Sequence, residues 1–221
     1  VAEDGAPLFL AEPRTNGLGI VPRNLVAADL LLRAEGERTS ARVIEAFPDR
    51  IESGSLVTEL PIREGAVKAL PEQDVLHLAL VNRYDDVPPV LGFIKGFGLR
   101  RGAMATSVAH DCHHILAVGA SPEEMSRAIN VVSRSGGFAV CDGGEISALP
   151  LEVAGLMSTA PARVVAQKEN ELVDRLTSMG CRLPAPFMTL SFQSLLVVPE
   201  LKIGDRGLFD TRRMEFVSAI L

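Results

Sequence analysis

The feature that most constrains the fold is a series of short apolar runs between residues 55 and 118, which precedes any segment suited to a long helix. The runs are bounded by Gly, Pro and Asp, as is typical of strands separated by tight turns. They cover residues 55–62, 74–82, 90–94, 103–109 and 115–118. Strands this dense, with no helices between them, favour an antiparallel or mixed sheet over a βαβ repeat. We therefore expect an α+β fold, in which a mixed, largely antiparallel sheet is layered with two main helices.

The first long helix signal follows this region. Ser121 is a good N-cap residue, Pro122 suits the first helical position and Glu124 completes a capping box. The Gly136-Gly137 pair predicts the end of that helix. A second helix is expected from about residue 161 to residue 179, where apolar residues recur at helical spacing and charged residues cover the opposite face.

Glycine between polar residues marks two expected hairpins. Asp142-Gly143-Gly144 separates two apolar segments and is a strong hairpin signal. Glu35-Gly36-Glu37 predicts a second hairpin, between strands over residues 30–34 and 40–47. A single helix over residues 27–34 is the competing interpretation of that segment.

The length of 221 residues suits one large domain or two small ones. We expect residues 1–28 to form an N-terminal arm or the tail of a preceding domain, and residues 29–221 to form one domain. Near the C-terminus, the continuous apolar run over residues 187–198 predicts a buried strand or a bent pair of strands.

Charge and composition argue against several classes of partner. The net charge is -6, Trp is absent and the basic residues are scattered, so the chain offers no basic surface to a nucleic-acid backbone. No apolar run reaches the roughly 18 residues that a membrane helix needs, and the N-terminus lacks the pattern of a signal peptide. Cys112, Cys141 and Cys181 are widely spaced and odd in number, which argues against a disulfide framework. We expect a cytoplasmic protein with no membrane or nucleic-acid partner.

The polar segment after the run at 103–109 is the candidate functional site. It holds three of the chain's four histidines, His110, His113 and His114, with Asp111 among them. Titratable groups that end an apolar strand indicate a binding or catalytic site. A hydrogen-bonded polar corner that closes the sheet explains the same pattern.

These residue types allow several chemistries. Imidazole and carboxylate groups can bind a divalent metal, but ligands this close in sequence seldom converge on one ion. The favoured interpretation is that His110 and Asp111 hydrogen-bond each other, or each other's backbone, and His77 is expected in the core. Cys112 has the neighbours of a reactive thiol, with buried packing as the alternative. Lys95 could contact an anion or belong to a solvated turn.

Four motifs resemble one family. Residues 93–103, 107–114, 149–158 and 186–192 resemble, in order, the C-terminal domain of bacterial and archaeal adenine deaminase. The resemblance extends from about Asp29 to the C-terminus. It implies a domain of an enzyme that hydrolyses adenine to hypoxanthine and ammonia in purine salvage.

The resemblance also implies a division of labour. In that family the chemistry belongs to a metal-dependent amidohydrolase barrel that precedes this domain, where metal-bound water attacks the purine. The divalent metal (manganese, iron or zinc) is implied in the barrel, with no metal ligand in this chain. We therefore expect the chain to be inactive alone and to complete or cover the active site of a barrel in the same or a separate chain. Adenine or a related purine is the expected ligand, and a homo-oligomer is the expected assembly.

The family's roles transfer to matching positions. Catalytic roles are implied for His110, Asp111 and His113. Contacts with the substrate are expected from Lys95, Ser107, Cys112 and His114. The chain departs from the family pattern at Cys112, His114 and Glu152, where Ser, Asn and Pro are usual. The departures at Cys112 and His114 put fine substrate selectivity in doubt.

Two other functions fit the sequence. One is a stand-alone module that binds a purine or another small metabolite without catalysis. The other is an interaction protein, in which the apolar strands serve homodimer formation and the histidine segment is only structural.

Overall fold

The computed structural model describes residues 2–3, 6–7 and 17–221. The strands are β1 (Ala2–Glu3), β2 (Ala6–Pro7), β3 (Arg38–Glu45), β4 (Gly54–Arg63), β5 (Ala66–Val67), β6 (Val75–Val81), β7 (Val90–Lys95), β8 (Ala103–Thr106), β9 (Ile115–Gly119), β10 (Phe138–Asp142), β11 (Glu145–Leu149), β12 (Leu201–Gly204), β13 (Gly207–Asp210) and β14 (Glu215–Val217). The helices are α1 (Pro122–Ser135), α2 (Ala162–Ser178) and α3 (Pro186–Ser191), with 3-10 turns η1 (Ala27–Leu30), η2 (Pro71–Gln73) and η3 (Phe192–Ser194).

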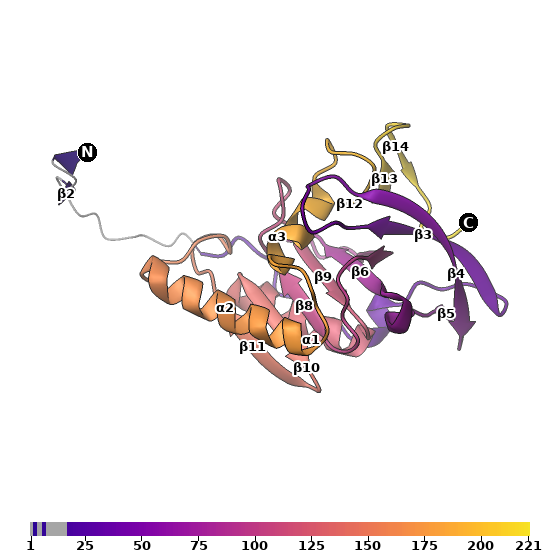
Figure 1. The fold of residues 1–221 in the computed structure, drawn as a ribbon, viewed down its shortest axis with the longest axis horizontal. Helices are drawn as coiled ribbons and strands as arrows, with labels where there is room; N and C mark the ends of the chain where they lie inside the picture. Colours follow the sequence, from indigo (N-terminus) through magenta and orange to yellow (C-terminus); the bar gives the residue numbers. More distant parts are fainter. Residues whose placement is uncertain (1, 4–5, 8–16) are drawn as a thin grey trace.

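A nine-stranded sheet forms the centre of the fold, in the order β11-β10-β8-β9-β6-β7-β3-β4-β5 (Figure 1). Its neighbouring strands are antiparallel except for β3 and β7, which run parallel. The strands β12, β13 and β14 form a separate antiparallel sheet, and β1 pairs with β2. The expectation of an α+β fold with a mixed, largely antiparallel sheet is confirmed.

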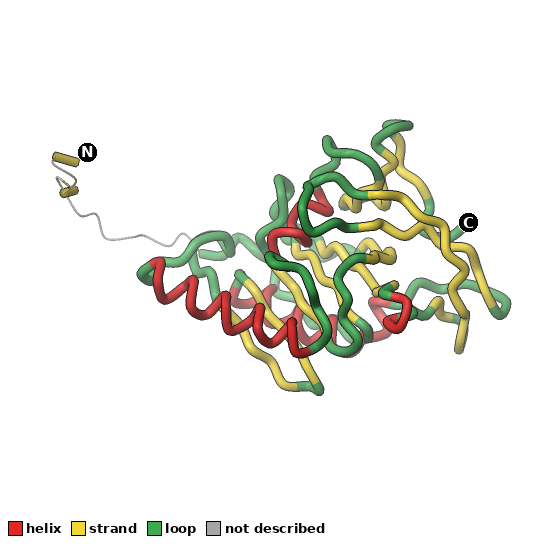
Figure 2. The backbone as a smooth tube through the Cα atoms, viewed as in Figure 1, coloured by secondary structure: helices red, strands yellow, loops and turns green. Residues whose placement is uncertain are grey.

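The two faces of the sheet bury different side chains because successive residues of a strand point to opposite faces. The face under α1 carries small residues, Ala79, Ala105, Ala117 and Ala139. The other face carries larger ones, Leu78, Met104, Val118 and Val140, and packs against α2, α3 and β12. Figure 2 shows α2 as the long helix in front of the strands, with α1 fainter behind them.

Most of the expected elements are present. The runs at 55–62, 74–82, 90–94, 103–109 and 115–118 correspond to β4, β6, β7, β8 and β9. The Ser121 hydroxyl accepts a hydrogen bond from the Glu124 amide at 3.3 Å, so α1 has the expected cap. The turn at Asp142-Gly143-Gly144 joins the antiparallel strands β10 and β11.

The hairpin expected at Glu35-Gly36-Glu37 is wrong. Residues before this turn form η1 and a single bridge from Arg33 to Ala66, and β3 pairs instead with β4 and β7. The competing helix over residues 27–34 is also wrong beyond the short η1. Partners distant in the chain decide this region, and a local turn signal does not report them.

The buried strand expected over residues 187–198 is wrong as well. The segment forms α3 and η3, which bury Phe187 and Leu190. A short apolar run does not distinguish a strand from a buried helix. Pro186 at the first helical position was the local signal for the helix.

The N-terminal segment packs on the main body from residue 18 onward. Ile20 and Leu25 are buried against the α1 face of the sheet. The Val21 amide donates to the Arg83 carbonyl at 2.7 Å. The proposed boundary at residue 28 stays a prediction, and much of the expected arm lies outside the described residues.

Over the described part of the chain, no helix is long and apolar enough to span a bilayer. The cysteines Cys112, Cys141 and Cys181 are all free.

Candidate functional site

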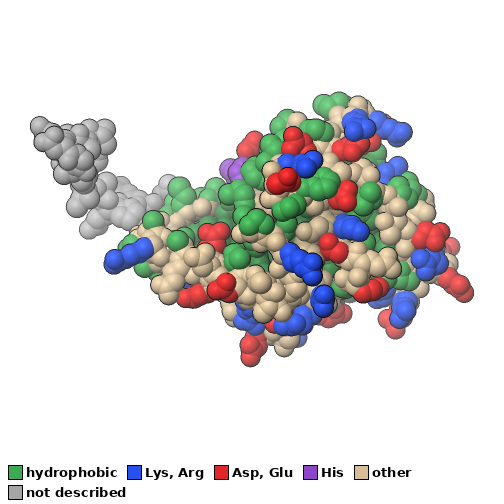
Figure 3. Space-filling view, in the orientation of Figure 1, with side chains coloured by type: hydrophobic (Ala, Val, Ile, Leu, Met, Phe, Trp, Pro, Cys, Tyr) green, Lys and Arg blue, Asp and Glu red, His purple; other side chains and the backbone are tan. Residues whose placement is uncertain are grey.

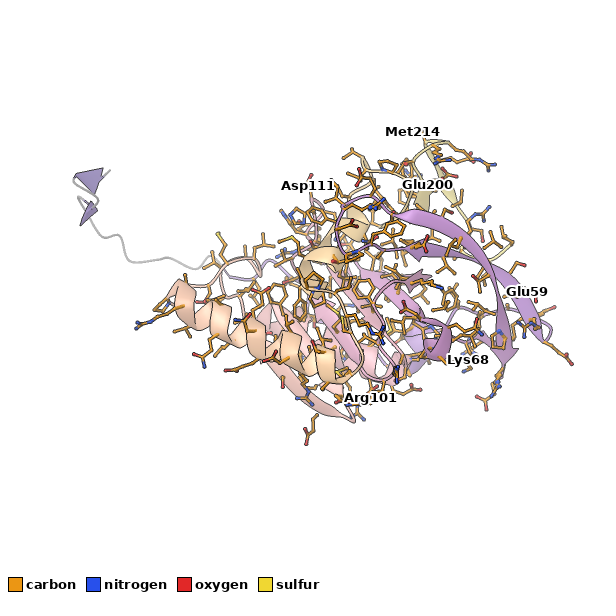
Figure 4. All side chains as sticks on the ribbon, in the orientation of Figure 1. Glu59, Lys68, Arg101, Asp111, Glu200 and Met214 are labelled. Atoms are coloured by element: carbon orange, nitrogen blue, oxygen red, sulfur yellow. The ribbon has the colours of Figure 1, made fainter. Side chains whose placement is uncertain are left out.

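The histidine segment forms the loop that joins β8 to β9. Figure 4 labels Asp111 on this loop at the upper margin of the molecule, and its side chain is exposed. His110, Cys112 and His113 are partly exposed, whereas His114 is buried where β9 begins. The loop therefore presents four consecutive side chains at or near the surface and anchors itself through the fifth.

His110 is fixed by the segment that contains α3 and η3. Its ring stacks on Phe192 with centroids 4.6 Å apart, and Nδ1 lies 3.0 Å from the Ser191 hydroxyl. Its amide donates to the Ser191 carbonyl at 3.0 Å, and its carbonyl accepts from the Ser194 hydroxyl at 2.8 Å. The expected bond between His110 and Asp111 is replaced by this contact with Ser191.

The bond to Ser191 also decides the tautomer of His110. The Ser191 hydroxyl donates its one proton to the Met188 carbonyl at 2.7 Å. It can then only accept from the ring, so neutral His110 carries its proton on Nδ1. Its Nε2 keeps a lone pair that can accept a hydrogen bond or a proton.

His114 faces the interior of the fold, unlike the partly exposed His110. Its Nδ1 accepts from the Arg83 amide at 3.3 Å, and its ring meets Tyr84 edge-on at 5.6 Å. Burial lowers the pKa of His114, which favours the neutral ring. The geometry gives His114 an anchoring role at the base of the loop.

Arg83 is the residue that sequence reasoning missed. It follows β6, is only 3% exposed and donates from its guanidinium to four backbone carbonyls. The acceptors are Gly19 (3.1 Å), His113 (3.1 Å), Leu18 (2.5 Å) and Ala154 (2.6 Å). Arg83 thereby joins three segments distant in sequence. The one signal for it in the sequence was a charged residue two positions after a largely apolar strand.

Ser107 and Lys95 lie apart from the exposed part of the loop. Ser107 is fully buried, and its hydroxyl donates to the Gly155 carbonyl at 2.5 Å and accepts from the Gly137 amide at 2.7 Å. Lys95 pairs with Val75 at one end of β6, whereas the loop adjoins Val81 at the other end. That separation is roughly 20 Å along the strand. The structure therefore does not bring Lys95 together with the histidines.

Two hollows lie near the loop. A cavity of about 470 Å³ is lined by residues 18–21, Arg83 and Tyr84. A groove of about 460 Å³ begins at Val108 and follows the N-terminal half of α2, with Phe138 and Met157 among its mostly apolar lining. Figure 3 shows hydrophobic atoms along the upper side of α2 and charged ones along its lower side. An apolar surface therefore lies beside the β8–β9 loop, which it meets at Val108.

A resident metal does not fit the side chains of residues 17–221. Within that part of the chain, no three His, Cys, Asp or Glu residues are grouped so that they could hold an ion. His77 is buried in β6, where its Nε2 accepts from the Ala69 amide at 3.4 Å. His110 and His114 each have Nδ1 engaged as described above.

Comparison with known proteins identifies the family. The sequence model of the adenine deaminase C-terminal domain matches residues 51–215. This chain is 44% identical to an adenine deaminase of Salinibacter ruber over 98% of its own length, and 40% identical to one of Methanosarcina barkeri over 98%. The chain belongs to the adenine deaminase C-terminal domain family. It spans about two fifths of the relatives it matches: 38%, 41% and, for one from Methanothermobacter thermautotrophicus, 39%.

Membership in the adenine deaminase C-terminal domain family confirms the resemblance. The structure shows what surrounds Glu152, one of the positions that depart from the family pattern. The Glu152 carboxylate accepts from the Thr159 amide at 2.6 Å and from the Thr159 and Ser158 hydroxyls at 2.5 and 3.2 Å. These bonds lower the pKa of Glu152 to about 2. Glu152 therefore closes the loop that leads into α2, which is a structural reason for an acid at this position.

Proposed function

We propose that this chain is the C-terminal domain of an adenine deaminase, which converts adenine and water to hypoxanthine and ammonia. The observation that carries the proposal is the family match over residues 51–215, combined with relatives of the same name that are about two and a half times longer. The chemistry then belongs to an amidohydrolase barrel, in the same or a separate chain. This domain completes or covers the active site of that barrel.

The β8–β9 loop is the part of the domain best suited to reach such a site. His110 is held by stacking and by Ser191, so its Nε2 has a defined position without being consumed internally. Asp111 and His113 lie beside it with exposed or partly exposed side chains. We assign His110, Asp111 and His113 to hydrogen bonding or proton transfer at the edge of the barrel's active site, and Cys112 to contact with the purine.

The remaining residues of the site act by position. His114 and Arg83 hold the base of the loop, and Ser107 ties the end of β8 to Gly137 and Gly155. A divalent metal (manganese, iron or zinc) would belong to the barrel and would supply an activated water there. The same proposal places the protein in the cytoplasm and in purine salvage.

A chimaera tests the proposal. The C-terminal region of the Salinibacter ruber relative is replaced by this chain, and ammonia release from adenine is measured. We expect an active chimaera and an inactive isolated chain. Ammonia release by the pure 221-residue chain would contradict the division of labour, as would a folded chimaera that is inactive.

Variants of the chimaera separate roles within the loop. His110→Ala should abolish most activity. Ser191→Ala, which leaves the imidazole but removes its partner, should reduce activity less and shift the pH profile. Arg101→Ala is the matched control, because Arg101 is 57% exposed and precedes β8, at the margin of the fold opposite to Asp111 (Figure 4). Equal activity of His110→Ala and the control would leave the loop a purely structural role, and adenine binding by the isolated chain would support the stand-alone module.

A further inference from the structure

The apolar side of α2 is well covered only in the second half of the helix. Leu172 and Leu176 are buried in the core, whereas Val164 is exposed and Val165 is half-buried. Figure 2 shows the first turns of α2 extending past the strands at the left of the view. The groove of about 460 Å³ follows this half of the helix, and an apolar surface left open in this way marks a site of interaction.

Two exposed methionines adjoin the groove. Met157 is part of its lining and is 60% exposed. Met188 is 51% exposed and follows Phe187, whose ring stacks on that of Phe138 in the groove with centroids 4.4 Å apart. Methionine is enriched in the cores of protein interfaces, where its flexible side chain adapts to the partner. The apolar surface therefore extends from the groove to α3.

This surface is continuous with the β8–β9 loop. Val108 lines the groove and stands two residues before His110. From α3, the Met188 carbonyl accepts from the Ser191 hydroxyl, which lies 3.0 Å from Nδ1 of His110. Figure 3 shows hydrophobic atoms along the upper left slope of the molecule, between α2 and the histidine atoms in purple. Whatever covers the groove and Met188 therefore also lies beside His110.

The path of the chain selects the occupant. The continuous described part of the chain begins at residue 17, and Ile20 lies against Gly155, two residues before Met157 of the groove. A domain that precedes this one is thus tethered at the edge of the groove, at a high effective concentration. This chain matches a C-terminal domain and spans about two fifths of its relatives. A free protein or a second copy of the chain has no such tether.

We propose that the groove, together with Met157 and Met188, is the surface on which the amidohydrolase barrel packs. This docking rests on the proposed function, which places a barrel before this domain and His110 at the edge of its active site. An apolar segment of the barrel fills the groove and covers both methionines. The contact holds the β8–β9 loop in place from the side that α3 leaves open.

Methionine oxidation measures this contact without any substitution. Dilute hydrogen peroxide converts accessible methionine to its sulfoxide, and mass spectrometry of peptides gives the rate at each position. Met214, which is 73% exposed just before β14, reports on a surface outside the groove (Figure 4). The buried methionines serve as unreactive references: Met104, Met125 and Met179.

The isolated chain and the chimaera with the Salinibacter ruber relative are compared. In the isolated chain, Met157, Met188 and Met214 should all oxidise, because all three are exposed. In the chimaera, Met157 and Met188 should oxidise at least about tenfold more slowly while Met214 keeps its rate, because only the first two are covered.

A charged variant tests whether the two methionines belong to one contact. Met157→Lys places a charge in the groove, so Met188 of the chimaera should lose most of its protection. Val57→Lys is the matched control, since Val57 is 61% exposed and lies on β4 at the opposite margin of the fold (Figure 1). Met188 should stay protected in that variant. Equal protection of Met188 in the two variants would contradict a shared contact.

Ammonia release from adenine, measured on the same samples, separates the docking surface from the proposed function. Unprotected Met157 and Met188 in a folded chimaera would overturn the docking surface, whether or not the chimaera is active. An inactive chimaera in which both are protected would support the docking surface and contradict the function. Protection of both already in the isolated chain would also overturn the docking surface, because residues of this chain or a second copy would then cover the groove.

Discussion

Replacing Arg83 by Met should destabilise the protein more than any surface arginine does. The guanidinium of Arg83 satisfies four backbone carbonyls, and Met preserves much of the side-chain volume while removing every donor. Leu18 and Gly19 line the cavity of about 470 Å³, so water can reach their carbonyls in the variant. The carbonyls of His113 and Ala154 have no such access through that cavity.

The magnitude follows from those two carbonyls. A buried polar group left without a partner costs about 1–3 kcal/mol, so two of them give about 4 kcal/mol. Because a domain of this size loses about 2–4 °C per kcal/mol, the melting temperature should fall by roughly 10 °C. This loss is a large part of the free energy of unfolding of a typical domain, which is roughly 5–15 kcal/mol, yet the variant should still fold.

Urea unfolding followed by circular dichroism measures the change, and Arg101→Met is the matched control. Arg101 bonds Asp142 at 2.8 Å but is 57% exposed, so solvent screens the pair and its loss should cost far less than the loss of Arg83. Hydrogen exchange should also accelerate in Arg83→Met at residues 18–21 and in the β8–β9 loop. A loss no greater than that of Arg101→Met, with unchanged exchange in these segments, would refute the reasoning.

Three further predictions concern groups outside the loop. Burial lowers the pKa of the fully buried Lys202 to about 8, so between pH 8 and pH 10.5 only the unfolded state keeps the proton. Urea titrations should therefore show the free energy of unfolding of the wild type rising by about 3 kcal/mol across this window, with no such rise in Lys202→Met. The Glu152 carboxylate has its pKa lowered to about 2 from 4.5, so its stabilisation is present above pH 4.5 and is lost as the pH falls towards 2; the NMR shift of the Thr159 amide should titrate with a midpoint near 2 in the wild type and not in Glu152→Gln. Gly96→Ala should lower the stability measured by thermal unfolding by about 3 kcal/mol or more, because the φ of Gly96 is +107° and a Cβ there would meet a backbone carbonyl. Gly143→Ala, with a φ of +60° and open space around it, should cost only about 1 kcal/mol, and equal losses in the two variants would contradict the steric argument.

The strands and the two main helices could be predicted because their signals are local. The strands β4, β6, β7, β8 and β9 are each an apolar run between turn residues, and Ser121 and Glu124 mark the start of α1. The partners of β3 could not be predicted, since its pairing with β7 joins Val43 to Phe93, far along the chain. The segment at 187–198 failed because its apolar run suited either structure.

The candidate site also has a part that could be predicted from the sequence and a part that could not. The cluster at 110–114 was visible because histidines are rare in this chain. Its supports were not visible, because Ser191 and Arg83 reach it from distant segments and carry no motif of their own. Lys95 was expected at the site from the family resemblance, yet the register of β6 places it at the end of that strand away from the loop.

The alanines beneath α1 have a consequence for how the protein can change. The side chains of Met125, Ile129 and Val132 of α1 already fill the space over these alanines, so any carbon added at Ala79, Ala105, Ala117 or Ala139 has to displace its neighbours. On the opposite face the destabilising substitutions are those that shorten a side chain, since shortening Leu78 or Met104 leaves a void. The two sides of one sheet thus tolerate opposite kinds of substitution, and variation accepted on one side would be rejected on the other.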